Sequence, residues 1–306
     1  MAVQESIYRA LKSTDIPYLI QYVAAYKKNH CLDNFAGNLP FVKEEYLRST
    51  GPGRRALSDQ FNAIIDNLVM QNGVKKTTYS MRQNGILSAV LSEKRCRIEK
   101  DRLKVLDVPS SSGTASLGLY EMLNKHYGIS SYVLGDLYFK IYYDAERDCI
   151  YDEEWNLLQK KFKTQFFTVN RAHRSADVHR IISHSLFLPF NLMSWYLKKR
   201  YRRTDRTRAD SIRLLHPEIE RRLHDGIFSI RKINVFEPIR EQFDLIVSFN
   251  LLQKNYFPRP LIQKGIDNLT NALSENGLLI MGDTVSFSVS MKRKGGLALI
   301  EKNGDF

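Results

Sequence analysis

Residues 104–114 of the chain read KVLDVPSSSGT, and this stretch decides the fold class. Its first five residues have the apolar character of a short buried strand, and the residues from Pro109 to Thr114 are small or loop-forming. A helical pattern follows and stops at Gly128, and the next apolar run, 132–136, predicts a second strand that ends in Asp136. A strand, a loop and a helix followed by another strand predict a parallel strand–helix–strand unit.

The C-terminal part of the chain continues the same alternation. Strands are predicted over 229–236, 243–249 and 278–282, and a helix is predicted between the last two. The tail, 284–300, predicts an antiparallel hairpin whose turn contains Lys294-Gly295-Gly296. Alternating strands and helices predict an α/β fold with crossover helices, and the ligand crevice of such a sheet lies at the carboxyl ends of its strands.

The remaining segments divide the chain into further parts. We expect a helical N-terminal region over 1–100, a core sheet built from 101–143 and 226–306, and an insertion over 144–225. The insertion is far longer than a crossover requires, so we expect it to have helices of its own.

Composition excludes several classes of protein. The chain has 306 residues, of which 43% are hydrophobic and 26% charged, and this balance is typical of globular proteins rather than disordered or fibrous ones. Its three cysteines (Cys31, Cys96 and Cys149) give no disulfide framework or zinc spacing. The N-terminus lacks a signal-peptide pattern, and no apolar run reaches the length of a spanning helix. These features predict a soluble protein of the cytoplasm.

The excess of positive charge is concentrated in one tract. The formal net charge is +13, and residues 198–208, KKRYRRTDRTR, contain seven basic side chains and one acid. The apolar segment 181–197 precedes this tract directly. An apolar, aromatic helix with a basic flank is typical of a peripheral contact with an anionic membrane, and a lid or dimer helix packed on the core is the alternative. One dense tract is not the distributed basic face that nucleic acids require, so a nucleic-acid partner is disfavoured.

The loop after the first strand predicts a nucleoside-type ligand. Small residues let a ligand approach the backbone at the N-terminus of the following helix. An acid at the end of the second strand, here Asp136, is placed to accept hydrogen bonds from both ribose hydroxyls.

Three stretches carry a resemblance to a known family. Residues 105–113 resemble the first motif of class I S-adenosylmethionine-dependent methyltransferases, whose Rossmann-like sheet ends in an antiparallel strand. Residues 241–252, followed by Tyr256-Phe257, are similar to the fourth-strand motif of the CheR-like subgroup. Residues 276–282 match the fifth strand of that subgroup in kind. The resemblance covers the two core segments and leaves the rest of the chain unassigned.

The resemblance implies S-adenosyl-L-methionine as cofactor and gives individual residues a role. Asp107 and the loop from Ser110 to Gly113 would hold the methionine end, and Asp136 would take the ribose hydroxyls. This loop includes Ser111. Asn234 and Val235 would lie beside the adenine, and Asn250 and Leu251 would lie beneath the sulfonium.

Catalytic and metal-binding residues are harder to predict. Tyr256 follows the fourth strand and is a weak candidate for the acceptor pocket, although simple packing explains it as well. His173, His179 and His184 have a spacing that fits neither one helical face nor a usual zinc set, so no metal site is expected.

The sequence also departs from the family pattern. Of the three glycines usual in the first loop only Gly113 is present, with Pro109 and Ser111 in the other two places. We therefore expect methyl transfer to a small-molecule, sugar or lipid-linked acceptor. The alternative is an inactive scaffold of the same fold, with or without a contact to a membrane. An amino-directed DNA methyltransferase is disfavoured because Asn250 is not followed by Pro-Pro-Tyr or Pro-Pro-Phe.

Overall fold

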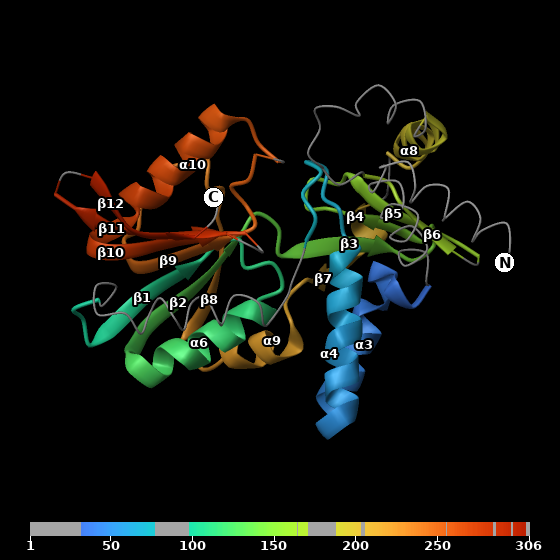
Figure 1. The fold of residues 1–306 in the computed structure, drawn as a ribbon. Helices are drawn as coiled ribbons and strands as arrows, with labels where there is room; N and C mark the ends of the chain where they lie inside the picture. The colour runs from blue at the N-terminus through green and yellow to red at the C-terminus, as the bar shows by residue number, and fades with distance from the viewer. Residues whose placement is uncertain are drawn as a thin grey trace, which may run out of the picture.

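A seven-stranded mixed sheet forms the larger lobe of the protein (Figure 1). The computed structural model describes residues 32–76, 98–163, 165–170, 188–202, 206–254, 256–283, 286–294 and 296–303. The strands of this sheet, in spatial order, are β12 (Gly296–Asn303), β11 (Phe287–Arg293), β10 (Leu273–Gly282), β9 (Phe243–Phe249), β1 (Arg102–Asp107), β2 (Gly128–Asp136) and β8 (Phe228–Lys232).

The five strands from β10 to β8 run parallel, and β11 and β12 close the sheet as an antiparallel hairpin. The predicted α/β class and its strands are confirmed. In β9 all seven residues are buried, as expected for a central parallel strand covered on both faces. The antiparallel neighbour of β10 is the penultimate strand β11, and the final strand β12 lies at the edge of the sheet.

Helices cover both faces of the sheet. On one face lie α6 (Thr114–His126) and α9 (Pro217–Leu223), whose Leu119, Leu123 and Ile219 share a core with the sheet. On the other lies α10 (Arg259–Asn271), which buries Leu269 against that face (Figure 1).

The smaller lobe contains a five-stranded antiparallel sheet where the sequence predicted helices. Its strands, in spatial order, are β6 (Gln165–Thr168), β5 (Leu157–Phe162), β4 (Cys149–Tyr151), β3 (Lys140–Asp144) and β7 (Asp210–Arg213). The described part of the insertion expected over 144–225 contains helices, as predicted, and in addition the strands β4 to β7. The sheet itself already begins at Lys140, inside the predicted core segment. These strands are short and mix apolar with charged residues, so the sequence shows no clean period-two alternation.

The described N-terminal residues pack on this inserted sheet. They form η1 (Leu32–Asn34), η2 (Ala36–Asn38), α3 (Leu39–Arg48) and α4 (Gly51–Asp66). Phe61, Ile64 and Ile65 of α4 share a buried cluster with Ile141 of β3 and Ile212 of β7. The described N-terminal helices thus pack on strands of the insertion, whereas α9 of the insertion packs on the larger sheet.

The two remaining helices lie on the smaller lobe, α8 (Leu188–Arg200) beside β5 and β6 and η4 (Arg206–Arg208) before β7 (Figure 1). The three histidines 173, 179 and 184, and residues 181–187 of the predicted apolar segment, lie outside the described residues. No helix in the described part of the chain has both the length and the apolar character needed to cross a bilayer.

Candidate functional site

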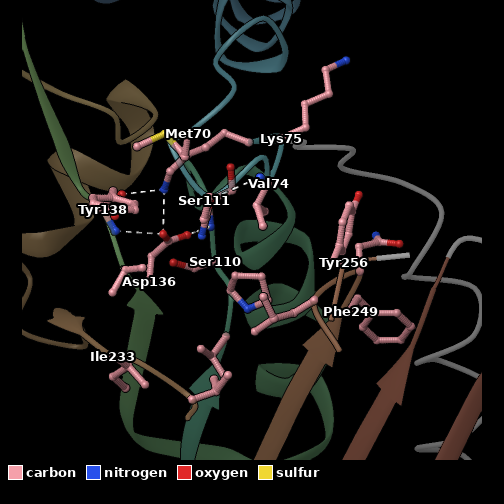
Figure 2. Close-up of a pocket in the computed structure, with 18 of the residues that line it drawn as sticks. Met70, Val74, Lys75, Ser110, Ser111, Asp136, Tyr138, Ile233, Phe249 and Tyr256 are labelled. Atoms are coloured by element: carbon pink, nitrogen blue, oxygen red, sulfur yellow. Dashed lines mark hydrogen bonds and ion pairs between the residues drawn. The ribbon is translucent and has the colours of Figure 1, made fainter. Parts of the chain in front are cut away.

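A cavity of about 420 Å³ lies where the two lobes meet, at the carboxyl ends of the parallel strands. The strands β1 and β2 supply Asp107 and Asp136, the loops after β8 and β9 supply further walls, and residues of the smaller lobe, including Met70 and Lys76, complete the lining (Figure 2). From β1 the chain proceeds outward to β2 and β8 before it returns to β9 on the other side. The cavity therefore lies at the topological switch point, the usual place of a ligand in such a sheet.

The serine turn after β1 lies at the floor of this cavity. The Ser110 backbone N–H donates to the Gly135 carbonyl at 2.8 Å, and the Ser111 N–H donates to Oδ2 of Asp136 at 2.8 Å. Ser111 has a φ of +52°, a conformation that a residue other than glycine adopts only when its surroundings fix it. The backbone donors of the turn are thus already directed at the protein.

Two side chains of the same turn have no partner among the described residues. Both hydroxyls, Ser110 Oγ and Ser111 Oγ, are buried, and neither makes a hydrogen bond to any described residue. A buried hydroxyl without a partner costs roughly 1–3 kcal/mol. Because both serines line the cavity, they point to a polar ligand or bound water as the missing partner.

The carboxylate of Asp136 takes part in one ion pair and two further hydrogen bonds. Its carboxylate pairs with Lys76 Nζ at 2.7 Å and accepts the backbone N–H groups of Tyr138 at 3.1 Å and Ser111 at 2.8 Å. Lys76 Nζ also donates to the Tyr138 carbonyl at 2.5 Å. The side chains of Lys76 and Asp136 are only 4% and 8% exposed. The predicted ribose acid thus lines the cavity, but as half of a buried ion pair (Figure 2).

The pair retains a limited capacity to bind a ligand. A carboxylate has about four acceptor sites and an ammonium has three donors. Asp136 uses three of its sites and Lys76 uses two of its donors. With respect to the described residues, one acceptor site and one donor therefore remain. This matches a diol that donates one hydroxyl hydrogen to Asp136 and accepts from Lys76 through the other hydroxyl.

Asp107 lies beside this pair at the end of β1. Its Oδ2 accepts the hydroxyls of Ser116 at 2.5 Å and Tyr132 at 3.2 Å. The pKa of Asp107 is raised from 3.8 to about 6. Burial is the largest cause, the hydrogen bonds from Ser116 and Tyr132 oppose it, and the neighbouring Asp136 adds to it. The carboxyl group is therefore ionised at neutral pH and changes charge in the weakly acidic range.

Gly113, like Ser112 before it, is a residue of the predicted loop that the structure places outside the cavity lining. It precedes α6 with a φ of +79°, and a Cβ at this position would lie 2.8 Å from Cγ1 of Ile219 in α9. Both observations explain why glycine is kept here: the backbone conformation and the close packing of α9 exclude a side chain. In this structure its role is to seat two helices, and no contact with a ligand is required.

The predicted adenine wall lies after β8. Asn234 and Val235 both line the cavity, with Ile233 and Phe236 beside them. The Asn234 amide is engaged locally, since its oxygen accepts the Phe236 N–H at 3.1 Å and its nitrogen donates to Glu237 at 2.9 Å. Asn234 therefore fixes a turn, and the buried Val235 supplies the apolar contact.

The loop after β9 forms the opposite wall. Asn250 has a φ of +60°, donates its N–H to the Gly282 carbonyl at 2.8 Å, and accepts a hydrogen bond from Gln253 at 3.2 Å. Leu251 and Tyr256 also line the cavity. Burial raises the pKa of the Tyr256 hydroxyl, so this phenol is protonated at neutral pH and fits a wall or a hydrogen-bond donor better than a base.

Sequence reasoning missed the contribution of the smaller lobe. Lys76 follows the turn at Asn72-Gly73, and a Lys-Lys pair after a turn is usually solvated, so no local signal marks it. Its partner lies 60 positions away. Tyr138 was missed too, although it follows the predicted Asp136 by two residues.

No family model and no curated protein matches the chain. Several solved structures resemble it distantly. An O-methyltransferase family protein from Burkholderia thailandensis has 13% identity and a TM-score of 0.31, with 78% of this chain and 47% of that chain covered. An S-adenosylmethionine-dependent methyltransferase from Clostridium acetobutylicum has 10% identity and a TM-score of 0.32, with 74% of each chain covered. The citrinin polyketide synthase CMeT domain has 11% identity and a TM-score of 0.29, with 76% of this chain and 39% of that chain covered.

These structural neighbours are methyltransferases, but the chain spans less than half the length of two of the three. TM-scores near 0.3 describe a distant likeness and define no family. What the protein does must therefore be argued from its own cavity.

Proposed function

We propose that this protein binds S-adenosylmethionine in the cavity between its lobes and transfers the methyl group to a small-molecule, sugar or lipid-linked acceptor. The observation that carries the proposal is the meeting of Asp136, Asp107 and two unpartnered serine hydroxyls at the switch point of the sheet. Acids at the ends of the first two strands, with a loop of small residues between strand and helix, are the parts that hold a nucleoside in such folds.

The residues present fit this cofactor. Ser110 and Ser111 offer hydroxyls that lack partners within the described chain, and the remaining capacity of the Lys76–Asp136 pair equals the need of one ribose diol. Val235 and Phe236 offer an apolar wall for a base. A cavity of about 420 Å³ also falls within the roughly 300–1,000 Å³ of small-molecule sites.

Each group then has a separate task. The bound cofactor would supply an electrophilic methyl group on its sulfonium. Asp136 and Lys76 would fix the ribose, and Asp107, ionised above pH 6, would accept the cofactor's ammonium group. Phe249 and Tyr256 would exclude water and align the acceptor, since alignment supplies most of the rate in a displacement of this kind.

The CheR-like affiliation belongs to the same proposal. The stretch that suggested it, 241–252, contains β9, and residues 276–282 form the end of β10. In the sheet, β9 lies beside β1 and β10 lies beside β9, the order that the proposal requires. They support a shared sheet but no receptor substrate, because the loop after Gly113 lacks the acidic pair of that subgroup.

Isothermal titration calorimetry of the full chain tests the proposal. We expect S-adenosylmethionine and S-adenosylhomocysteine to bind with one site per chain at pH 7.5. Ser110→Ala and Ser111→Ala should each weaken binding about threefold to tenfold, the equivalent of one hydrogen bond of roughly 0.5–1.5 kcal/mol. Ser130→Ala is the matched control, because its hydroxyl donates to the Leu103 carbonyl outside the cavity. Absence of binding by a folded protein, or equal affinities in all variants, would refute the proposal.

One observation favours a second function, an inactive scaffold that keeps the fold. Three of the acceptor sites of Asp136 are already filled by Lys76, Ser111 and Tyr138, so the carboxylate is satisfied without a ligand. If the titration shows no heat of binding, Lys76→Met separates the two functions. Binding that appears only in this variant would identify a cofactor site blocked by its own lysine, and no binding in either protein would favour the scaffold.

A further inference from the structure

Helix α8 of the smaller lobe is apolar on the face that it turns toward solvent. Leu192, Trp195, Tyr196 and Lys199 follow at intervals of three, one and three residues, which places them on one stripe of the helix. Their apolar members are 57%, 62% and 53% exposed in the order given. A surface helix of a globular protein normally has polar residues in this position.

The opposite side of α8 packs on the inserted sheet. Ser194 and Leu197 are 8% and 2% exposed. Ser194 Oγ donates to the Val169 carbonyl at 2.6 Å, and Leu197 belongs to a buried cluster with Tyr151 and Leu157. The helix is therefore fixed to the inserted sheet by one side, and its exposed stripe is not needed for that packing.

The exposed face does not serve the cavity. None of the described residues of α8 lines it, which argues against a lid formed by this helix. Met193, on the flank of the stripe, is also 45% exposed. The described part of the chain thus leaves four large apolar side chains of one helix uncovered, which marks an interaction site rather than scattered surface hydrophobics.

Positive charge borders this apolar stripe. Lys198, Lys199, Arg200 and Arg202 are exposed and form no ion pair with any described acid. Lys199 Nζ lies 5.2 Å from the centre of the Trp195 ring. Two acids of the same lobe have other partners, since Glu146 pairs with Arg208 at 2.9 Å and Asp148 pairs with Lys161 at 3.4 Å. The four basic side chains therefore remain available to an anionic partner.

We propose that the exposed stripe of α8, with the basic residues 198–202, docks on the surface of a bilayer that contains anionic lipid. Trp and Tyr rings fit the boundary between headgroups and acyl chains, Leu192 and Met193 fit the hydrocarbon, and the lysine and arginine tips reach the headgroups. The aliphatic members offer no ring for stacking on nucleic-acid bases. A lysine within the stripe disfavours a protein interface, whose centre is depleted of lysine.

The proposal is independent of the reaction in the cavity and is tested on the full chain with vesicles. We expect co-sedimentation with phosphatidylcholine vesicles that contain phosphatidylserine, little with phosphatidylcholine alone, and a decline as salt screens the charges. Lys199→Gln with Arg200→Gln should lower the partition coefficient about 25-fold, since each charge contributes about fivefold. Trp195→Ser with Tyr196→Ser should lower it at least about tenfold.

The matched control variants replace exposed apolar or basic side chains that lie outside α8. Phe41→Ser with Leu299→Ser removes two side chains that are 65% and 60% exposed, and Arg55→Gln with Lys125→Gln removes two exposed charges. Neither control should change binding. Circular dichroism of each variant shows whether it is folded.

Fluorescence gives a second measurement at the stripe itself. The chain has two tryptophans, and Trp155→Phe keeps an aromatic ring against Tyr142, which stacks on Trp155 at 4.4 Å. In this variant the Trp195 emission should shift to shorter wavelength on vesicles with phosphatidylserine. No sedimentation at low salt, equal binding to neutral vesicles, or an unchanged Trp195 spectrum would overturn the proposal. The proposal would also be overturned if the protein did not bind vesicles but bound single-stranded RNA or formed a dimer, and if the Trp195 variant lost that binding.

Discussion

Replacing Lys76 by methionine tests the ion pair that joins the two lobes at the cavity. Lys76 and Asp136 are almost fully buried and their charged atoms lie 2.7 Å apart. Removal of one member of a buried pair typically costs about 3–5 kcal/mol, because the other charge is left without compensation. Asp136 would keep two backbone donors, from Ser111 and Tyr138. We therefore expect the lower end, a loss of about 3 kcal/mol in the free energy of unfolding.

A double-mutant cycle isolates the pair itself. Asp136→Asn should cost about 4 kcal/mol, because it leaves the Lys76 ammonium buried with the Tyr138 carbonyl as its remaining partner. The double variant should be more stable than the sum of the two losses predicts, with a coupling free energy of about 2–3 kcal/mol. Urea unfolding of the full chain at pH 7.5, followed by circular dichroism, measures all three variants.

A second lysine provides the comparison. Lys43 pairs with Glu220 at 2.7 Å, but the two side chains are 13% and 29% exposed, so Lys43→Met should cost less, about 1–2 kcal/mol. A loss below about 1 kcal/mol for Lys76→Met, or a coupling below about 0.5 kcal/mol, would refute the assignment. It would mean that Asp136 is not committed to the smaller lobe and that the cavity is not held closed in this way.

Three further predictions concern stability. In the folded protein Asp107 has a pKa of about 6, against an ordinary value of 3.8. Its contribution to the free energy of unfolding is therefore fully present below pH 3.8 and is lost as pH rises through 6. Relative to the wild type, the Asp107→Asn variant should become more stable by about 3 kcal/mol as the pH is raised from 3.5 to 7. Burial lowers the pKa of His216 from 6.5 to about 4. The contribution of the neutral imidazole to the free energy of unfolding is therefore fully present above pH 6.5 and is lost as pH falls through 4. His216→Asn retains a side-chain cap for α9 and should remove this pH dependence of about 3 kcal/mol. The two effects oppose each other between pH 4 and 6. A steep rise of the wild-type stability in this range would contradict the Asp107 prediction, and a steep fall would contradict the His216 prediction. Gly113→Ala should cost about 2–3 kcal/mol in thermal unfolding, through its positive φ and the contact with Ile219, whereas Gly53→Ala in the exposed first turn of α4 should cost nothing.

The core sheet could be predicted from the sequence because its signals are local. The strand predicted over 243–249 matches β9, whose residues are all buried, and the hairpin turn falls between β11 and β12. The strand predicted over 229–236 ends earlier, at Lys232, because Asn234 forms a turn with its own amide. Boundaries therefore failed where a side chain competes for the backbone.

The smaller lobe and its part in the site could not be predicted. Strands as short as β4 and β6, of three and four residues, carry too few positions to show a period. The Gly51-Pro52-Gly53 segment has the composition of a loop, yet it begins α4, since proline is tolerated in the first turn of a helix. Lys76 reaches Asp136 only through packing of the two lobes, and such a contact leaves no trace in the sequence near either residue.

The site residues were predicted as a set of positions, and the structure brings most of them to one cavity. Asp107, Ser110 and Asp136 line it, as do Asn234, Val235, Asn250 and Leu251, while Gly113 lies behind it against α9. Their role toward a cofactor stays a prediction. What the sequence did not reveal is that Asp136 is shared with a lysine of another lobe.

A crystal structure of the full chain grown with S-adenosylhomocysteine tests the central claim most directly. The account predicts the adenosyl group between the serine turn and Val235, with its two ribose oxygens at Asp136 and Lys76. Ligand density elsewhere, or a cavity that stays free of the ligand at saturating concentration while the ion pair is intact, would contradict it.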